Sequence, residues 1–148
     1  MTQGVIAGAV LIVALSIGAV LRRRQTIDAP TQPMFAAPSQ IDRADFEDVQ
    51  TPWLVVVFSS ASCVTCADVV RKAKVLACRE VAVIDVEHAA SPAMHRKYHV
   101  DAVPIAIVAD RAGVVRASFV GPMSATDLWA AVAEVRYPGS SPEPHLGH

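Results

Sequence analysis

Residues 53–58 form an uninterrupted apolar run, WLVVVF, in which three of the side chains are valines. Such a run of β-branched residues is typical of a strand that is buried on both faces of a sheet. Residues 63–80 follow with a helical pattern, because apolar side chains recur there at spacings of three and four residues. A strand that needs cover on both faces and is followed by an amphipathic helix predicts an α/β fold.

The chain after residue 41 contains further elements of both kinds. Strands are predicted at residues 81–86, 105–109 and 114–120, and helices at residues 42–49, 91–98 and 124–136. The first two strands are joined by a long helix, which makes them a parallel pair. The last two are joined by a tight turn, which makes them an antiparallel hairpin. We therefore expect an α/β domain with a mixed sheet and flanking helices.

The amino-terminal 21 residues carry no charged side chain, and residues 4–21 are apolar apart from Ser16. Eighteen helical residues span about 27 Å, close to the hydrocarbon thickness of a bilayer. The alternatives are a buried core helix and a cleaved signal peptide. A core helix normally has a polar face, and a signal peptide normally has a cationic residue before its apolar run. The pattern predicts one retained transmembrane helix.

Three arginines, Arg22 to Arg24, follow the apolar run directly. Cationic residues that flank a span favour the cytoplasmic side, so we expect the soluble domain in the cytoplasm of a single-pass membrane protein, with an extracytoplasmic domain as the alternative. The sequence divides into an anchor with its basic flank (1–24), a linker rich in proline (25–40), the domain (41–136) and a disordered tail (137–148).

Composition excludes several other classes of protein. A hydrophobic content of 53% with 18% charged residues excludes intrinsic disorder, and three cysteines are too few for a disulfide-rich miniprotein. The net charge of −1 gives no basic field for nucleic acid. No nucleic-acid partner is expected.

Cys63 and Cys66 form a CxxC pair between the buried strand and the helix. A sulfur at a helix amino terminus faces free N–H groups and the positive end of the dipole, which favours the thiolate and lowers the thiol pKa. We expect Cys63 to be the exposed, acidic nucleophile toward disulfides, and the shielded Cys66 to resolve the mixed disulfide.

Half of a zinc site and an incidental cysteine pair are the competing interpretations of this motif. A zinc site needs two more ligands, and the one remaining cysteine, Cys78, has no histidine at paired spacing beside it. The strand–CxxC–helix context indicates redox chemistry rather than metal binding. We expect Cys78 to be a small apolar filler at the end of the helix, with a regulatory or intermolecular thiol as the alternative.

Five segments carry a resemblance to a known family: WLVVVFSSASCVTC (53–66), IDVE (84–87), KYHVDAVPI (97–105), ADRAG (109–113) and FVG (119–121). The chain resembles the thioredoxin-like superfamily, specifically membrane-anchored bacterial thioredoxin-domain proteins. The resemblance implies that Pro104 is cis and lies opposite the cysteine pair, and that the backbone of Val103 pairs with substrate. It also implies that Gly121 lets the chain pass close to the site. A trans proline at a strand edge and a simple turn glycine are the alternatives at Pro104 and Gly121.

Several positions depart from thioredoxins. Ser62 replaces the tryptophan before the first cysteine, and Val64-Thr65 replaces Gly-Pro. Thioredoxins pair a buried aspartate with a lysine in the next strand, and we align Val57 and Ala82 with those two positions. Without that carboxylate, removal of the Cys66 proton must rely on water or on the attacking geometry, and turnover should be slower.

The resemblance implies a membrane-tethered thiol–disulfide oxidoreductase that reduces protein disulfides and needs no metal, flavin or nucleotide cofactor. Its expected partners are protein thiols and disulfides, a reducing protein, and a bilayer contacted through residues 4–21. The alternative function is a non-catalytic module that binds a membrane partner.

Overall fold

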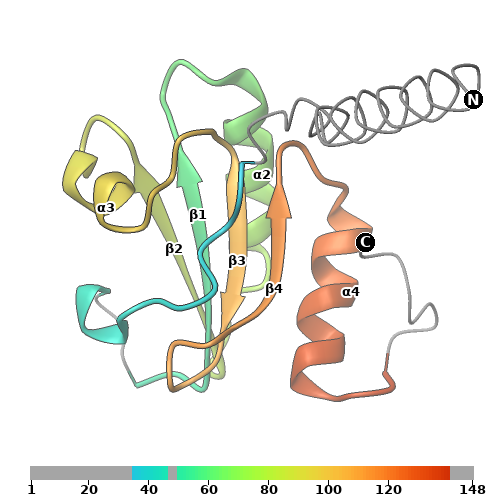
Figure 1. Ribbon diagram of the computed structural model, residues 1–148. Coiled ribbons are helices and arrows are strands. Elements are labelled where there is room, and N and C mark those ends of the chain that lie inside the picture. The colour runs from blue at the N-terminus through green and yellow to red at the C-terminus, as the bar shows by residue number, and fades with distance from the viewer. Residues whose placement is uncertain (1–34, 47–49, 141–148) are drawn as a thin grey trace, which may run out of the picture. The chain divides into compact units, whose positions relative to one another are not determined.

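The computed structural model describes residues 35–46 and 50–140. The predicted transmembrane helix lies outside these residues, and within them no helix has the length and apolarity needed to cross a bilayer. The elements, in chain order, are η1 (Arg43–Asp45), β1 (Trp53–Ser59), α2 (Val64–Lys74), β2 (Val81–Glu87), α3 (Pro92–Lys97), β3 (Ile105–Ala109), β4 (Val115–Val120) and α4 (Ala125–Arg136) (Figure 1).

The described strands form one mixed sheet in the order β2-β1-β3-β4. β1 runs parallel to β2 and antiparallel to β3, and β3 pairs antiparallel with β4. The predicted parallel pair and hairpin are therefore confirmed. Phe58, near the end of β1, pairs with Ile105, the first residue of β3. The loop after β1 and the loop before β3 therefore lie at the same end of the sheet (Figure 1).

The central strand β1 is buried on both faces, as its sequence predicts. Leu54, Val56 and Phe58 point into one core, which also contains Phe46 after η1 and packs against Met94 of α3, whereas Val55 and Val57 point into a second core. All five have no exposed surface. The second core contains residues of α2 and α4, so these two helices share the face of the sheet opposite α3 (Figure 1).

The helix predicted over residues 63–80 ends at Lys74 in the structure. The connection needs residues 75–80 to turn back toward the start of β2, and Cys78 and Val81 exchange two backbone hydrogen bonds in that turn, at 3.0 and 3.2 Å. Cys78 is exposed. Its predicted role as an apolar filler is wrong, because it lies in the turn rather than on the buried face of the helix.

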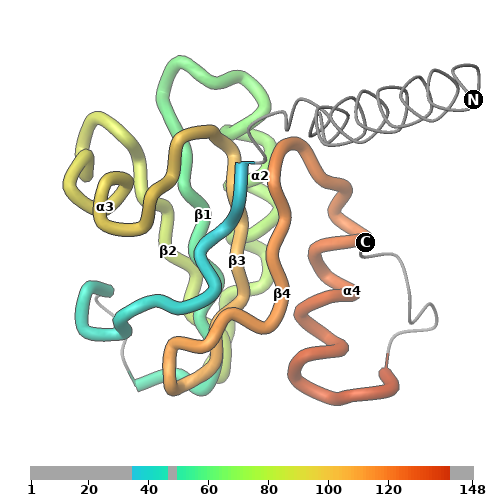
Figure 2. The backbone as a smooth tube through the Cα atoms, in the orientation of Figure 1, coloured from blue at the N-terminus to red at the C-terminus, as the bar shows by residue number. Residues whose placement is uncertain are grey.

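Residues 37–41 belong to the fold, although the sequence boundaries place most of them in the linker. Ala37 packs against the first core. The carbonyl of Ser39 accepts from the Val115 N–H at 3.0 Å, and the Ile41 N–H donates to the Gly113 carbonyl at 2.9 Å. The segment runs from the end of the sheet where β1 finishes down to the β3–β4 turn (Figure 2).

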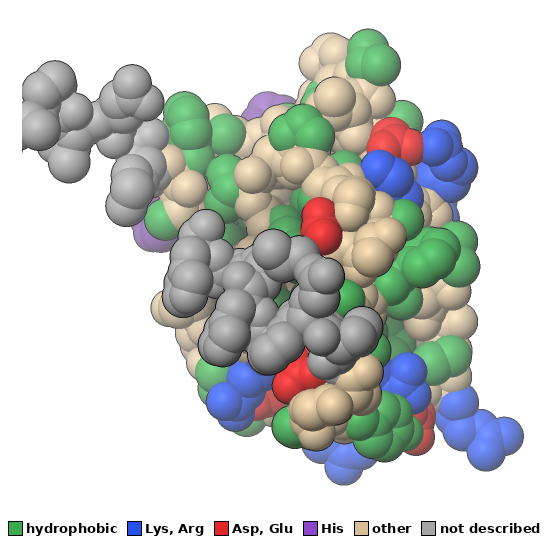
Figure 3. Space-filling view, turned by 90° about the vertical axis from the view of Figure 1, so that its right-hand side faces the viewer, with side chains coloured by type: hydrophobic (Ala, Val, Ile, Leu, Met, Phe, Trp, Pro, Cys, Tyr) green, Lys and Arg blue, Asp and Glu red, His purple; other side chains and the backbone are tan. Residues whose placement is uncertain are grey.

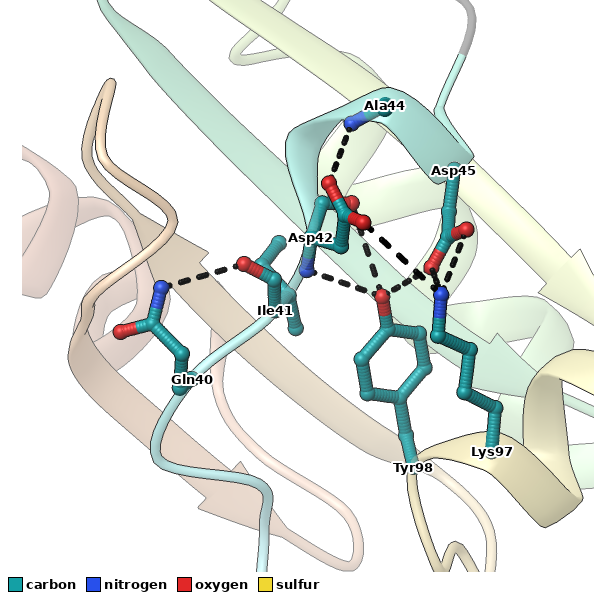
Figure 4. A network of polar contacts seen from close by, with 7 residues as sticks. All are labelled: Gln40, Ile41, Asp42, Ala44, Asp45, Lys97 and Tyr98. Atoms are coloured by element: carbon teal, nitrogen blue, oxygen red, sulfur yellow. Dashed lines mark hydrogen bonds and ion pairs between the residues drawn. The ribbon is translucent and has the colours of Figure 1, made fainter.

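Polar contacts fix the end of this segment against α3 (Figure 4). The predicted helix over 42–49 is here the three-residue 3-10 helix η1, and residues 47–49 lie outside the described residues. The Tyr98 hydroxyl accepts from the Asp42 N–H at 3.0 Å and donates to the Asp45 carboxylate, which also pairs with Lys97 at 2.5 Å. Hydrogen bonds from Lys97 and then Tyr98 lower the pKa of Asp45. Burial, and then Asp45, raise the pKa of Tyr98 to about 12.

Candidate redox site

Cys63 is the N-cap residue of α2. Its backbone is extended, with φ −96° and ψ 106°, and its sulfur accepts a hydrogen bond from the Cys66 N–H at 3.1 Å. The Thr65 hydroxyl lies 3.4 Å from the same sulfur. The Cys66 N–H lies in the first turn, where backbone donors have no partner four residues earlier, and it also donates to the Cys63 carbonyl at 3.2 Å. The sulfur therefore takes the place that a serine or aspartate oxygen normally fills.

Cys63 and Cys66 are joined as a disulfide, with their Cα atoms 5.3 Å apart. Cys66 is only 1% exposed, whereas Cys63 is half-buried and the intervening Val64 is 89% exposed. The first turn of α2 therefore presents one sulfur toward solvent and turns the other toward the sheet. The unequal exposure expected from the sequence is observed.

The loop that precedes Cys63 is tied to β2. The Ala61 N–H donates to the Glu87 carboxylate at 3.0 Å, and the Cys63 N–H donates to the Ser60 carbonyl at 3.0 Å. Backbone N–H groups of Ala90, Ala89 and Ala61, in that order, lower the pKa of Glu87. An ionised carboxylate thus anchors the loop that positions the exposed sulfur.

Pro104 and Gly121 lie together at the same end of the sheet. The Val103–Pro104 peptide bond is cis, as the resemblance implies, and the Gly121 N–H donates to the Pro104 carbonyl at 2.8 Å. Gly121 has φ +88°, but a Cβ atom built there would meet nothing within 4 Å. The requirement for glycine is therefore conformational, rather than the close approach that the resemblance implies.

A hollow of about 380 Å³ joins the cysteine loop to the residue before the cis proline. Ser60 and Val103 line it from these two sides, together with His88 and His95. His95 is 2% exposed, and its Nε2 lies 2.9 Å from the Val86 carbonyl. Sequence reasoning missed this buried histidine, because its immediate neighbours along the chain include charged side chains that suggest a solvated helix.

Asp85 is a second residue that sequence reasoning missed. Ala82, which we aligned with the thioredoxin lysine, pairs with Leu54, whereas the residue opposite Val57 is Asp85. Asp85 lines a hollow of about 450 Å³ that both cysteines also line. A carboxylate is therefore present beside the pair, on the neighbouring strand. Only the register between the two strands could have revealed it.

Cys78 lies apart from this site, beyond the far end of α2. Among the described residues, no group of three or more histidine, cysteine, aspartate and glutamate side chains is placed to hold a metal ion. Seen from the side of α4, the described surface mixes acidic, basic and hydrophobic side chains (Figure 3).

Comparisons with known proteins give similarity in structure but not in sequence. No family model matches the chain, and no curated protein matches it in sequence. A mutant form of the thioredoxin from Halobacterium salinarum NRC-1 is similar with a TM-score of 0.55 at 19% identity, over 67% of this chain and 93% of that one. Thioredoxin from Fasciola hepatica is similar with a TM-score of 0.51 at 24% identity, over 58% of this chain and 83% of that one. Together with the mixed sheet and its flanking helices, these similarities show that the domain has a thioredoxin-like fold.

Proposed function

We propose that the chain is a thiol–disulfide oxidoreductase, tethered to a membrane, that reduces disulfides in other proteins. The observation that carries the proposal is the Cys63–Cys66 disulfide at the amino terminus of α2, in which residue Cys63 is half-buried and residue Cys66 is 1% exposed. This asymmetry supplies an accessible nucleophile and a protected resolving thiol, which are the two groups that disulfide exchange requires.

In the reduced protein, the Cys63 thiolate attacks one sulfur of a substrate disulfide. A Cys63–substrate disulfide forms, and the other substrate sulfur leaves as a thiolate. Cys66 then loses its proton and attacks the Cys63 sulfur, which closes the intramolecular disulfide and releases the second substrate thiolate. The substrate gains two electrons and the protein loses two, so a dithiol reductant must restore the starting state.

Insulin reduction by the purified full chain tests this function. We expect catalysed reduction with dithiothreitol as reductant, and its loss in Cys63→Ser. Cys66→Ser should accumulate the mixed disulfide, whereas Cys78→Ser should retain the activity, because Cys78 lies in the exposed turn after α2. A wild-type chain that leaves insulin disulfides intact would overturn the proposal and favour the binding-module alternative.

The proposed tether is the uncharged segment of residues 4–21, followed by Arg22 to Arg24. Its length matches a bilayer, and the arginines favour a cytoplasmic domain. A cytoplasmic location would in turn favour reduction over oxidation, because cytosolic thiol pools are kept reduced.

A further inference from the structure

We infer that Asp85 accepts the proton of the Cys66 thiol when Cys66 resolves the mixed disulfide. The inference rests on the proposed function, since it concerns one step of that exchange. It assigns the proton acceptor to β2, the strand beside the one in which thioredoxins bury their aspartate.

Strand register places Asp85 on the face of the sheet that α2 covers. Asp85 lies opposite Val57 in the parallel β1–β2 pair, so the two side chains project from the same face. Val57 points into the core that contains residues of α2. Asp85 itself is exposed, because β2 is the edge strand of the described sheet. Its carboxylate therefore occupies the open side of the space beneath α2.

The hollow of about 450 Å³ is the physical connection between Asp85 and Cys66, because both residues line it. Arg71 and Lys74 line it from α2. Solvent in a hollow of this size can carry a proton from the thiol to the carboxylate. The step moves a negative charge from the Asp85 carboxylate to the Cys66 sulfur, and the two nearby cations stabilise that charge.

Ser59 fixes the orientation of the carboxylate. Its hydroxyl, in a residue only 4% exposed, donates to Asp85 Oδ1 at 2.5 Å. Ser59 is the last residue of β1 and also lines the hollow. The hydrogen bond therefore turns one carboxylate oxygen inward, toward the layer in which Cys66 is buried.

Glu87 lines the same hollow but is less suited to accept the proton. Its two carboxylate oxygens accept from the N–H groups of Ala61 and Ala90, at 3.0 and 2.8 Å. These bonds stabilise the ionised form and lower the pKa of Glu87, which makes it a weaker base. Of the two acidic side chains that line the hollow, Asp85 is the stronger candidate.

The step conserves protons and electrons. The Cys66 S–H bond breaks and its proton passes to the Asp85 carboxylate. The Cys66 sulfur then bonds to the Cys63 sulfur as the Cys63–substrate disulfide breaks, and the substrate leaves as a thiolate that takes a proton from solvent. The substrate disulfide is the oxidant, and Asp85 later returns its proton to water.

The resolving step can be observed with 5,5′-dithiobis(2-nitrobenzoate), which needs no knowledge of the natural substrate. The reduced full chain carrying Cys78→Ser should release one thionitrobenzoate when a thiol attacks the reagent, at a rate proportional to the reagent concentration. It should then release a second when the mixed disulfide is resolved, at a rate independent of that concentration. The second release reports the attack by Cys66. Its rate should stay flat between about pH 5.5 and 7, because it then depends on proton transfer to the Asp85 carboxylate and not on the small fraction of Cys66 that is already thiolate.

Asp85→Asn should slow the second release at pH 6 by roughly tenfold or more. The rate should then rise roughly tenfold per pH unit, because only the thiolate already present can attack. Asp85→Glu should restore the flat profile. Asp127→Asn is the charge-matched control, since it removes a carboxylate in the first turn of α4 and should leave both phases unchanged.

The outcomes separate the inference from the function on which it rests. A wild-type chain that never releases the second thionitrobenzoate would overturn the proposed function. A wild-type chain with both phases, together with an Asp85→Asn variant of unchanged rate and profile, would overturn the inference alone. A uniform slowing at every pH would also overturn it, because that result indicates a purely structural role. Asp85 is exposed, so the variant should fold, and its thermal unfolding checks this.

Discussion

At the scale of single residues, Cys63 caps α2 and Cys66 lies inside its first turn. The cap sulfur already accepts the Cys66 N–H in the disulfide form. When the disulfide is reduced, the same donor and the helix dipole remain available to a Cys63 thiolate. No comparable donor is expected for Cys66, whose own N–H is the one in use. The two thiols should therefore differ in reactivity as well as in exposure.

Alkylation of the reduced chain with iodoacetamide across a pH series measures this difference. We expect the alkylation rate of one thiol to follow a pKa well below the free-cysteine pKa of about 8.5. That reactive thiol should vanish in Cys63→Ser and persist in Cys66→Ser, with Cys78→Ser as the background for all variants. Loss of the reactive thiol in Cys66→Ser instead would reverse the two roles.

The sequence predicted the cysteine pair correctly but not all of its surroundings. A buried apolar run followed by a helical pattern is a local signal, so it places Cys63 at a helix start. The pairing of Val57 with Asp85 joins residues far apart in the chain. It depends on how two strands align, which single-sequence periodicity does not determine. In the structure Ala82 pairs with Leu54, so it does not lie opposite Val57.

At the scale of elements, the β3–β4 turn depends on Gly113. This glycine has φ +78°, and a Cβ atom built on it would lie 2.0 Å from the Ile41 carbonyl oxygen. The close approach comes from the backbone bond between Ile41 and Gly113. The turn therefore holds the amino-terminal segment only if the side chain at residue 113 is a hydrogen atom.

Gly113→Ala should lower the free energy of unfolding by about 2–4 kcal/mol, from the left-handed backbone and the backbone clash together. Urea denaturation of the full chain measures the change. Gly139→Ala is the control, because its φ of +84° is similar but a Cβ there meets nothing within 4 Å. Equal effects of the two substitutions would contradict the proposed clash.

The contact between η1 and α3 should make stability depend on alkaline pH. The pKa of Tyr98 is about 12 in the folded chain, above its ordinary value of 10.0. The unfolded chain therefore loses this proton first, and the stabilisation is present below about pH 10 and lost as the pH rises toward 12.

Tyr98→Phe should remove that part of the pH dependence and lower the free energy of unfolding at pH 7 by about 1 kcal/mol through the lost hydrogen bonds. Urea denaturation between about pH 7 and 11.5 compares it with the wild type. Tyr137→Phe, at a tyrosine that is 58% exposed, should leave the alkaline slope unchanged. An alkaline slope that survives Tyr98→Phe would contradict this assignment.

Most element positions follow from the sequence, and the failures have physical causes. β3 matches its predicted residues, and β1, β2, β4 and α4 differ by one residue at an end. α2 is shorter than predicted, because apolar spacing continues through Leu76 and Ala77 while the chain is already turning toward β2. Periodicity reports which side chains are apolar, but it does not report where a connection must reverse direction.

At the scale of the whole molecule, the proposed orientation can be tested with a reporter. A phosphatase that becomes active only outside the cytoplasm, fused after residue 148, should stay silent in cells. Replacing Arg22, Arg23 and Arg24 with glutamine should raise its activity, because the cationic flank that orients the span is lost. A strong signal from the unaltered chain would contradict a cytoplasmic domain and support the extracytoplasmic alternative.

The path of residues 35–41 sets where a tethered domain can work. The segment enters the fold at the end of the sheet that carries the CxxC loop and the cis proline, and then runs toward the opposite end (Figure 2). Ten residues, 25–34, separate that entry point from the basic flank, and fully extended they reach roughly 35 Å. If residues 4–21 anchor the chain as proposed, this reach limits how far residue 35, where the domain begins, can lie from the basic flank. Proteins held at the same membrane surface would then meet the disulfide at a higher local concentration than freely diffusing proteins would.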